Sequence, residues 1–578
     1  MNKLFRHKIF VAAMMFGFML VGASCEDTVG INPTAATPFA DKKMKEVILE
    51  DSVLSDFVDV LYACGEHCID SLFDQSRVYT LWAPMNGTFN KDSIIEKTTT
   101  DRDHVFRSFI MAHIANHLVP ANGVLDSNNQ VLLLNNKNAL FTGNYKDGYT
   151  FSGVPLLKEE MNIRVMNGLL HKIAKPSEYK YSIWEYLKVA ENVDSVRDYL
   201  YSFDVTEFNQ GASLVGPVVN GQQTYIDSVF TTSNVWLNAT RVGRLDSEDS
   251  TYVVYVPSND MWEKAVELAE SYFNYDLSSD NLSDIKKEER DSLRRYYARL
   301  HTLKFMTYSV KEQRHLKFPE DSAMPAYRGQ YKRPLFAKED LERYVIPELT
   351  KELSNGTFKV VDAMPYKPTD LWHDTIFLEG ENTSMLDTTA VSLSSTEILY
   401  ASKKEINTDS IFIGSEISGG AYFNLPKSEG IATVKFYVPK VLSAKYNVAI
   451  VFVPRNITNA NIDKETMYKS KLNINVTQQP GKGSVNRLYD GRRIFTYTDP
   501  FKVDTLFLTV DGERDSERAV IQPKYCESYD VTSSKEYAFQ IEVKTNQPTN
   551  KEKKEGINYD TSIRIDKILL IPVLDTEE

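Results

Sequence analysis

Two pairs of side chains near the N-terminal end have the types and spacing that metal or redox chemistry requires. Cys64 and Cys68 flank Gly-Glu-His, so they can close a small disulfide loop outside the cytoplasm or, with His67, contribute to a metal site. His113 and His117 stand four residues apart in a stretch that reads as a helix, where both rings can face one ion. Neither pair has further ligands placed by spacing, and the Glu of the zinc-peptidase motif is missing between the histidines. We therefore expect no metal site and no cofactor, and the spacing alone does not decide whether the two cysteines are bonded.

Linear patterns of nucleotide-binding or nucleophilic chemistry are missing from the sequence. It contains no phosphate loop ending in Gly-Lys-Ser/Thr, no Gly-x-Ser-x-Gly elbow and no Gly-x-Gly-x-x-Gly after a strand. A carboxylate pair for glycoside hydrolysis leaves no linear signature, so the 79 Asp and Glu residues do not exclude a glycosidase. We interpret the chain as non-catalytic, with a glycosidase as the alternative.

Aromatic side chains offer the remaining binding chemistry, because sugars and peptides stack on their faces. Tyr327, Tyr331 and Tyr344 cluster in the sequence and are candidate ligand contacts. The alternative is that they pack a loop onto the surrounding domain. Trp236 and Trp372 are further candidates. The basic neighbours of the tyrosines are Arg328, Lys332, Arg333 and Arg343.

The N-terminal segment has the composition of an export signal. Three basic residues precede an apolar run at 9–21, which is shorter than the roughly 20 residues that span a bilayer. Such a run with a small-residue cleavage site is typical of a secretory signal peptide. The ending Gly22-Ala-Ser-Cys25 resembles a bacterial lipobox, with Gly in place of the common Leu. The resemblance implies that residues 1–24 are removed and that Cys25 is lipidated, the alternative being an ordinary signal peptide with a chance cysteine.

The lipid would place the protein at a membrane without a transmembrane helix. Stable anchoring takes at least two acyl chains, which a bacterial lipoprotein carries. Glu26-Asp27 resembles the signal that sends lipoproteins of the Bacteroidota to the outer face of the outer membrane. We expect a lipid-anchored outer-membrane protein that faces the cell exterior. Residues 25–43, rich in Pro, Thr, Ala and Asp, read as its flexible lipidated spacer.

Composition indicates a globular, multi-domain body. Of 578 residues 42% are hydrophobic and 25% charged, which suits packed cores, and the length allows three or four domains of about 100 to 200 residues. The formal net charge of −13 argues against nucleic acid and anionic lipid surfaces as partners, because both bind basic patches. Cys526 has no evident partner and is expected to be a buried thiol.

Two parts of the chain repeat one pattern. The segments Tyr79–Phe89 and Tyr252–Trp262 are each an apolar run ended by Pro, which belongs at a strand end because it cannot donate to a sheet. Asn86 and Asn259 follow the prolines and are predicted to cap the next helix. The second such helix is expected to bury one face made of Met261, Ala265, Leu268 and Tyr272.

A second pair of motifs closes each repeat. Asn167-Gly168 and Asn355-Gly356 each precede an apolar strand and predict a hairpin, because Asn and Gly tolerate positive φ. The interval between the two motifs is longer in the second repeat, which predicts an insertion there.

This order of motifs resembles the fasciclin domain. Asn116-His117 matches the Tyr-His motif of that family, with Asn in place of Tyr, and Tyr308-Ser309 is the corresponding stretch of the second repeat. The resemblance implies a fasciclin-like α/β module at 44–178, here called the first module. A divergent second module with an insertion would follow at 179–370. In both modules the apolar residues of the motifs would form the core. In the first module His117 would be a hydrogen-bonded scaffold residue. The expected core residues are Leu81, Trp82, Leu169, Leu170, Val254, Tyr255 and Phe358.

Residues 371–578 lose the helical period. Five β-rich runs, at 433–439, 446–454, 505–510, 537–543 and 563–571, predict an all-β sandwich, while 545–560 reads as an exposed loop. Ile565–Pro572 resembles the last strand of jelly-roll carbohydrate-binding modules. The expected fold is thus multidomain α+β, with two fasciclin-like modules and a jelly-roll-like sandwich.

We expect a surface lipoprotein that binds protein or glycan, in adhesion or as an accessory subunit of a SusC/SusD-type nutrient importer. Fasciclin domains look like adhesion modules, and such lipoproteins often accompany these importers. Expected partners are the outer membrane through the lipid, such a transporter or other surface lipoproteins, and a glycan or peptide ligand. The alternative is a glycan-binding protein or glycosidase that acts through the C-terminal sandwich.

Overall fold

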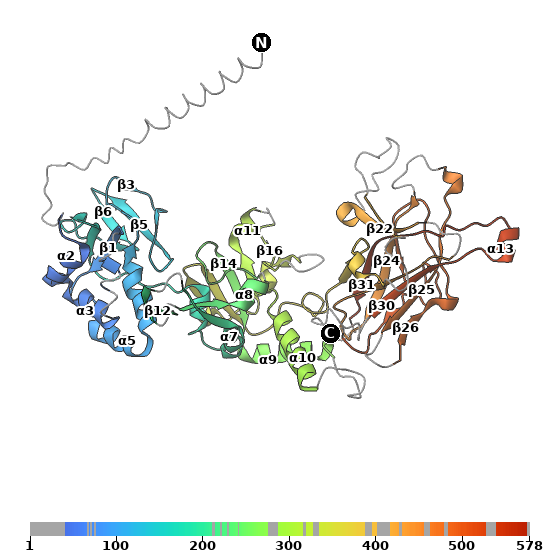
Figure 1. Cartoon of the computed structure of the whole chain (residues 1–578), viewed down its shortest axis with the longest axis horizontal. Coiled ribbons are helices and arrows are strands. Elements are labelled where there is room, and N and C mark those ends of the chain that lie inside the picture. The colour runs from blue at the N-terminus through green and yellow to red at the C-terminus, as the bar shows by residue number, and fades with distance from the viewer. Residues whose placement is uncertain are drawn as a thin grey trace, which may run out of the picture. The chain divides into compact units, whose positions relative to one another are not determined.

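The computed structural model describes residues 41–574, except 66–68, 70–71, 74–76, 211–213, 220–221, 228–229, 241, 275–286, 316–318, 328–333, 388–395, 401–416, 427–430, 456–462, 479–483 and 527–538. The predicted signal peptide, Cys25, the spacer up to residue 40, Cys68 and Tyr331 lie outside the described residues. The chain is a mixed α+β protein with several sheets (Figure 1). It divides into two compact units, one ending at Lys180 and one starting at Tyr181. Among the described helices, none is both long and apolar enough to cross a membrane.

The first unit is built on a four-stranded sheet of order β2-β1-β9-β8. Its centre is the parallel pair β1 (Tyr79–Pro84) and β9 (Gly168–Ile173), in which every residue is buried. Parallel strands read as continuous apolar runs because both of their faces are covered. The edge strands β2 (Ile114–Ala115) and β8 (Ile163–Val165) pair with the centre in the antiparallel sense. The strand predicted before Pro84 and the strand predicted after Asn167 are both confirmed.

Helices precede and follow strand β1 along the chain. The first helix ends before Asp51, whose carboxylate accepts a hydrogen bond of 3.2 Å from Val53 N and starts a new turn. The helices are α2 (Met44–Glu50), η1 (Ser52–Leu54), α3 (Ser55–Ala63) and α5 (Lys91–Val105), which continues through η2 (Phe106–Ile110) and η3 (Met111–His113).

A second, antiparallel sheet completes the first unit, with order β3-β5-β6-β7 and β4 paired to β5. Trp82 of β1 stacks on Phe151 of this sheet, with ring centroids 4.4 Å apart, so a single aromatic core joins the two sheets. The strands are β3 (Val124–Leu125), β4 (Gln130–Leu132), β5 (Asn138–Asn144), β6 (Gly148–Phe151) and β7 (Val154–Pro155).

The second unit repeats the first sheet. Its order is β15-β14-β19-β18, with β14 (Tyr252–Pro257) parallel to β19 (Gly356–Val361) and in the same register as β1 and β9. The edge strands are β15 (Thr307–Ser309) and β18 (Lys351–Leu353). The strand order and register of the first sheet therefore recur in the second unit. In these ladders Tyr308 pairs with Val253, and Ala115 pairs with Thr80 at the same place in the first sheet. The structural counterpart of Tyr308 is therefore Ala115, one residue before the Asn116 that the sequence motif predicted.

In the two Asn-Gly motifs the asparagine forms hydrogen bonds to distant backbone groups, and the glycine lets two strands approach closely. Neither asparagine has a positive φ. Asn167 accepts from Met44 N (2.7 Å) and donates to Phe73 O (2.8 Å), while Asn355 accepts from Ile183 N (2.8 Å) and donates to Leu245 O (2.9 Å). The hairpins themselves are confirmed. A Cβ on Gly168 would lie 2.0 Å from Tyr79 O, and one on Gly356 would lie 1.8 Å from Tyr252 O. Only glycine lets the parallel strand start there.

The prediction that Asn86 and Asn259 cap the next helix is wrong. The caps are Asn90 for α5 and Ser258 for α9 (Asn259–Tyr272). Instead each asparagine reaches back to the helix before its strand: Asn86 accepts from Asp56 N (2.8 Å), and Asn259 accepts from Ser195 N (2.9 Å). The polar side chain thus caps an upstream helix that lies far away in sequence, which a local pattern does not reveal.

The interval between β14 and β15, which holds α9 and α10 (Lys287–Thr302), is longer than the interval between β1 and β2, which holds α5, η2 and η3. α9 buries Met261, Ala265 and Tyr272 as predicted, but Leu268 is 42% exposed and Ala269 is buried in its place. Other elements of this module are α6 (Ile183–Leu187), α7 (Asp194–Tyr201), α8 (Val235–Thr240), α11 (Val310–His315), β16 (Ser322–Ala323), β17 (Phe336–Ala337), α12 (Lys338–Glu342) and η5 (Pro347–Leu349).

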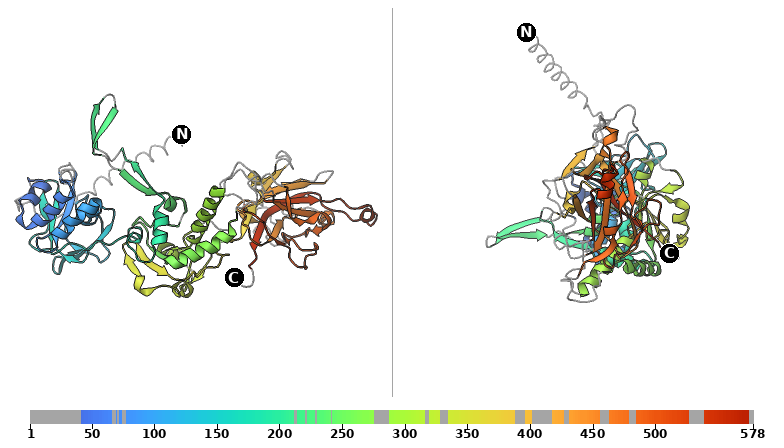
Figure 2. Two further views of the ribbon diagram at one scale, coloured as in Figure 1. Left: turned by 90° about the horizontal axis from the view of Figure 1, so that it is seen from below. Right: turned by 90° about the vertical axis from the view of Figure 1, so that its right-hand side faces the viewer.

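A two-stranded arm leaves the second module between α7 and α8 (Figure 2). β10 (Asp204–Phe208) pairs with β13 (Phe230–Asn234), and β11 (Leu214–Val219) pairs with β12 (Gln222–Asp227), in two separate antiparallel ladders. This arm was not predicted from the sequence, because β10 and β13 are exposed on almost every residue and lack the burial pattern that marks a core strand.

The C-terminal β region, residues 371–578, contains two larger sheets. One has the order β21-β22-β31-β24-β28 with β20 and β29 as side strands, and the other has the order β23-β30-β25-β26 with β27 on β25. Phe423 of the first sheet meets Phe436 of the second, with ring centroids 5.5 Å apart, inside one shared core. The five predicted strands are confirmed as β23 (Thr433–Tyr437), β24 (Tyr446–Phe452), β28 (Asp504–Phe507), β30 (Phe539–Thr545) and β31 (Ile563–Pro572).

The remaining strands of this region are β20 (Ile376–Glu379), β21 (Glu397–Tyr400), β22 (Ala421–Leu425), β25 (Lys471–Gln478), β26 (Asn486–Asp490), β27 (Thr496–Tyr497) and β29 (Val520–Ile521). The exposed loop predicted at 545–560 is wrong in part, because it holds α13 (Asn550–Lys554). Thr549 and Glu552 form a capping box there, and Glu552 also accepts from the buried Lys471 at 2.8 Å.

Candidate functional site

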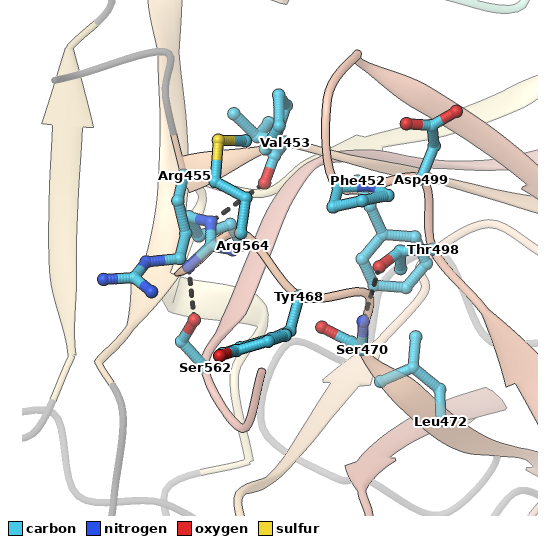
Figure 3. A pocket seen from close by; sticks show the side chains of 13 residues that line it. Phe452, Val453, Arg455, Tyr468, Ser470, Leu472, Thr498, Asp499, Ser562 and Arg564 are labelled. Atoms are coloured by element: carbon cyan, nitrogen blue, oxygen red, sulfur yellow. Dashed lines mark hydrogen bonds between the residues drawn. The ribbon is translucent and has the colours of Figure 1, made fainter. Parts of the chain in front are cut away.

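A small cavity opens at one end of the C-terminal β region, between strands of its two sheets (Figure 3). Arg564 forms one wall, and its guanidinium donates to Val453 O (2.9 Å), to Asp560 Oδ2 (2.7 Å) and to Ser562 Oγ. Burial acts to raise the pKa of Asp560, but Arg564 and Ser562 outweigh it and hold that pKa below its usual value. Other lining residues are Arg455, Tyr468, Ser470, Thr498 and Asp499.

The size of this cavity decides what it can hold. Its volume is ≈ 20 Å³, which is room for about one water molecule. Ligand pockets span about 300 to 1,000 Å³. The cavity is therefore too small for a sugar ring. The hydrogen bonds of Arg564 go to neighbouring protein groups, so this side chain stabilises the end of the sheets.

Three carboxyl groups gather beside the turn at Ser418 in the same region. Ser418 donates from Oγ to Glu379 (2.6 Å) and from N to Asp566 (2.9 Å). Burial raises the pKa of Asp566 to about 6, although Lys567 Nζ lies 3.4 Å from its second oxygen. Burial also raises the pKa of Glu381, and the nearby charge of Glu379 adds to the effect. Within the described residues, no three or more His, Cys, Asp or Glu side chains are arranged to hold a metal ion.

The predicted histidine pair does not share a helix face. His113 ends η3 and is fully buried, donating from Nδ1 to Phe109 O (2.6 Å) and accepting from Ser177 N (2.9 Å) at Nε2. His117 follows strand β2 and is exposed. A further buried histidine, His171, stacks on Trp82 and contacts Val119 O through Nε2 at 3.0 Å. Burial lowers the pKa of both His113 and His171 to about 4, so both rings are neutral scaffold groups.

The cysteines occupy structural positions. Cys64 is buried at the C-terminal end of α3, and its predicted partner Cys68 lies outside the described residues. Cys526 is a buried free thiol, as predicted, and burial raises its pKa to about 12. A thiol with such a high pKa is a poor nucleophile at neutral pH.

The aromatic candidates are mostly packed. Tyr327 is half-buried against Phe305, and Tyr344 is half-buried against a separate cluster around Tyr255, so the two do not form one aromatic face. Trp236 and Trp372 are 3% and 6% exposed, which makes them core residues and not open stacking platforms.

Exposed aromatic surface is found instead on the arm of the second module. Phe230 is 61% exposed and Phe208 40% exposed, and Phe208 contacts both Phe230 (5.8 Å) and Tyr225 (4.8 Å) edge to face. One sequence signal could have found this surface: no Lys or Arg occurs between Arg197 and Arg241. Exposed strands normally carry charges, especially lysine, that prevent pairing with other chains.

Comparison with known proteins gives a likeness among solved structures alone. Scans of protein-family models and of curated proteins found no match. Among solved structures, the chain is similar to a FAS1 domain pair from the insect cell adhesion molecule Fasciclin I, at 15% sequence identity and a TM-score of 0.20. The match covers 55% of this chain and 98% of that chain.

Proposed function

We propose that this chain is a non-catalytic lipoprotein of the outer membrane, exposed at the cell surface, that binds another protein. The observation that carries the proposal is the arm, which exposes Phe208 and Phe230 on strands without basic side chains. An isolated two-stranded ladder is marginally stable in water, and an uncovered aromatic face gains stability when a partner covers it. In this proposal Cys25 and its lipid hold the arm at the membrane surface, in adhesion or beside a SusC/SusD-type importer.

The domain layout in this proposal is two fasciclin-like modules followed by a jelly-roll-like sandwich. The matching strand order and register of the two four-stranded sheets support the duplication. The shared core of the two C-terminal sheets supports the sandwich. The adhesion and accessory roles are inferred from the resemblance of the sequence motifs to those of fasciclin modules.

Purification of the native lipoprotein in mild detergent tests the accessory role. The proposal expects it to migrate with a transporter or another surface lipoprotein, and expects the variant F208S/F230S to lose that partner. A matched control is F501S, because Phe501 is 49% exposed on the C-terminal β region. Migration alone in wild type, or retention of the partner by the arm variant, contradicts the proposal.

The glycan alternative places a ligand on the C-terminal β region. The cavity at its end is too small for a sugar, so a glycan would have to bind an open face. A glycan array probed with the full chain distinguishes the two readings, because protein binding through the arm predicts no specific sugar.

A further inference from the structure

A groove runs between α7 and α9 of the second module, with α10 at one side, and has a volume of ≈ 510 Å³. α7 contributes residues spaced three and four apart, so one face of that helix lines the groove. Ligand sites span about 300 to 1,000 Å³, so the groove has the size of a binding site. Its lining residues are Ser195, Asp198, Tyr199, Ser202, Trp262, Glu263, Val266, Glu267, Glu270 and Arg299.

The floor of the groove is aromatic and apolar. Tyr199, Trp262 and Val266 are 8%, 3% and 9% exposed, and the rings of Tyr199 and Trp262 lie 5.8 Å apart. The hydroxyl of Tyr199 is buried and has no hydrogen-bond partner among the described residues. A buried polar group without a partner is destabilising, so a ligand group that reaches this hydroxyl supplies the missing hydrogen bond.

The rim of the groove is acidic. Four carboxylates and one guanidinium line it. Asp198 is paired with Arg197 at 3.1 Å, and Glu270 lies 3.7 Å from Arg294. Glu263 and Glu267 are exposed and make no ion pair in the part of the chain that the structure describes. Arg299 lies over the ring of Tyr199, at 5.8 Å from its centroid, which shows that this aromatic floor accommodates a cation.

We propose that this groove binds a basic segment of a partner protein, with Lys or Arg side chains between Glu263 and Glu267 and apolar side chains on the floor at Trp262 and Val266. Charge complementarity favours this occupant over a glycan, a nucleic acid or an anionic lipid. It also disfavours a second copy of this chain, whose formal net charge is −13. The inference rests on the proposed function, since it gives a protein-binding chain a second contact surface beside the arm.

The test uses the full mature chain with Cys25→Ser, which lacks acyl chains, and a synthetic helical peptide of Leu and Lys as the probe. The groove variant is E263Q/E267Q, which removes two charges without changing side-chain size. The matched control is E339Q/E348Q, because both of these glutamates are exposed in the same module outside the groove. We expect at least about tenfold weaker binding by isothermal titration calorimetry for the groove variant and less than about twofold for the control.

Peptide binding by Tyr199→Phe is a second measurement, and general charge attraction does not affect its result. This substitution deletes only the buried hydroxyl, so we expect about fivefold weaker peptide binding, the size of one hydrogen bond, with no loss of thermal stability. Equal effects of the groove and control variants, unchanged binding by Y199F, or equal binding of a Leu-Glu peptide would each overturn the proposal. So would sedimentation velocity showing that wild type forms a dimer which E263Q/E267Q abolishes. If groove variants keep the native partner while F208S/F230S loses it, the proposed function stands and the groove inference fails.

Discussion

The thiol of Cys526 donates a hydrogen bond of 3.0 Å to the carbonyl oxygen of Tyr272, the last residue of α9. Ser443 of the C-terminal β region donates to the same oxygen at 2.9 Å through its hydroxyl. Asn274 N also donates to Ser443 Oγ at 3.2 Å. The last carbonyl groups of α9 have no hydrogen-bond donor within the helix. Donors from the C-terminal β region bond to the carbonyl group of Tyr272 here. The second module and that region are therefore joined by specific polar contacts within one unit.

The first prediction concerns the reactivity of this thiol. Because burial raises the pKa of Cys526 to about 12 and the side chain is fully buried, almost no thiolate exists at pH 8. We expect iodoacetamide to modify Cys526 at least about a hundredfold more slowly in the native chain than in 6 M urea. Peptide mapping by mass spectrometry follows Cys526 separately from the other cysteines. Rapid labelling of the native chain would show that the contact with Tyr272 opens readily.

The second prediction concerns the paired asparagines of the two modules. Asn167→Ala leaves Met44 N and Phe73 O without partners, and Asn355→Ala does the same to Ile183 N and Leu245 O. We expect each change to lower the free energy of unfolding by about 2 to 4 kcal/mol, as buried groups lose their bonds. Urea unfolding measures this.

The control for these variants is Asn128→Ala, since Asn128 is exposed, and we expect a change below about 0.5 kcal/mol. A loss in only one module would argue that the two asparagines have different roles despite their matching positions.

Burial on both faces made the central strands predictable from sequence. Leu81, Val254 and Phe358 are core residues as expected, and Phe539, Ile541 and Val543 alternate with less buried neighbours on β30. Roles that depend on tertiary partners were not predictable. Asn86 reads locally as a cap for the next helix but bonds to Asp56 N, thirty residues upstream. The groove was also hidden, because its lining comes from three helices and its charges look like ordinary solvated helix faces.

The third prediction concerns the arm. The ladder of β10 and β13 is exposed on almost every residue and is held partly by the ring contacts of Phe208. Each aromatic pair contributes about 0.5 to 1.5 kcal/mol. We expect Phe208→Ser to speed amide exchange of this ladder about tenfold while leaving β14 and β19 unchanged, measured by hydrogen exchange with mass spectrometry. Unchanged exchange in the ladder would mean that something other than these rings holds the arm.

The fourth prediction concerns acid. His113 and His171 have folded pKa values of about 4, below the ordinary value of 6.5, so the unfolded chain binds protons more readily than the folded one. Stability from these rings is therefore complete above pH 6.5 and is lost as the pH falls towards 4, by up to about 3 kcal/mol for each ring. Urea unfolding followed by hydrogen exchange of β1 and β9, the strands that hold Trp82 and His171, should show this loss. His171→Gln should reduce the slope, and an unchanged slope would assign the acid sensitivity to other groups.

The fifth prediction has the opposite sign and concerns Asp566. Its folded pKa of about 6 lies above the ordinary 3.8, because burial disfavours the charged carboxylate. The folded chain then binds the proton more tightly, so this group destabilises the C-terminal β region as the pH rises from about 4 to 6. Asp566→Asn keeps an oxygen for Ser418 N and removes the charge, so we expect it to raise the free energy of unfolding at pH 7 by about 2 kcal/mol and to have little effect at pH 4. Calorimetric unfolding of wild type and variant at both pH values measures the difference. A variant that is less stable at pH 7 would show that the contact with Lys567, 3.4 Å away, outweighs the cost of burying the charge.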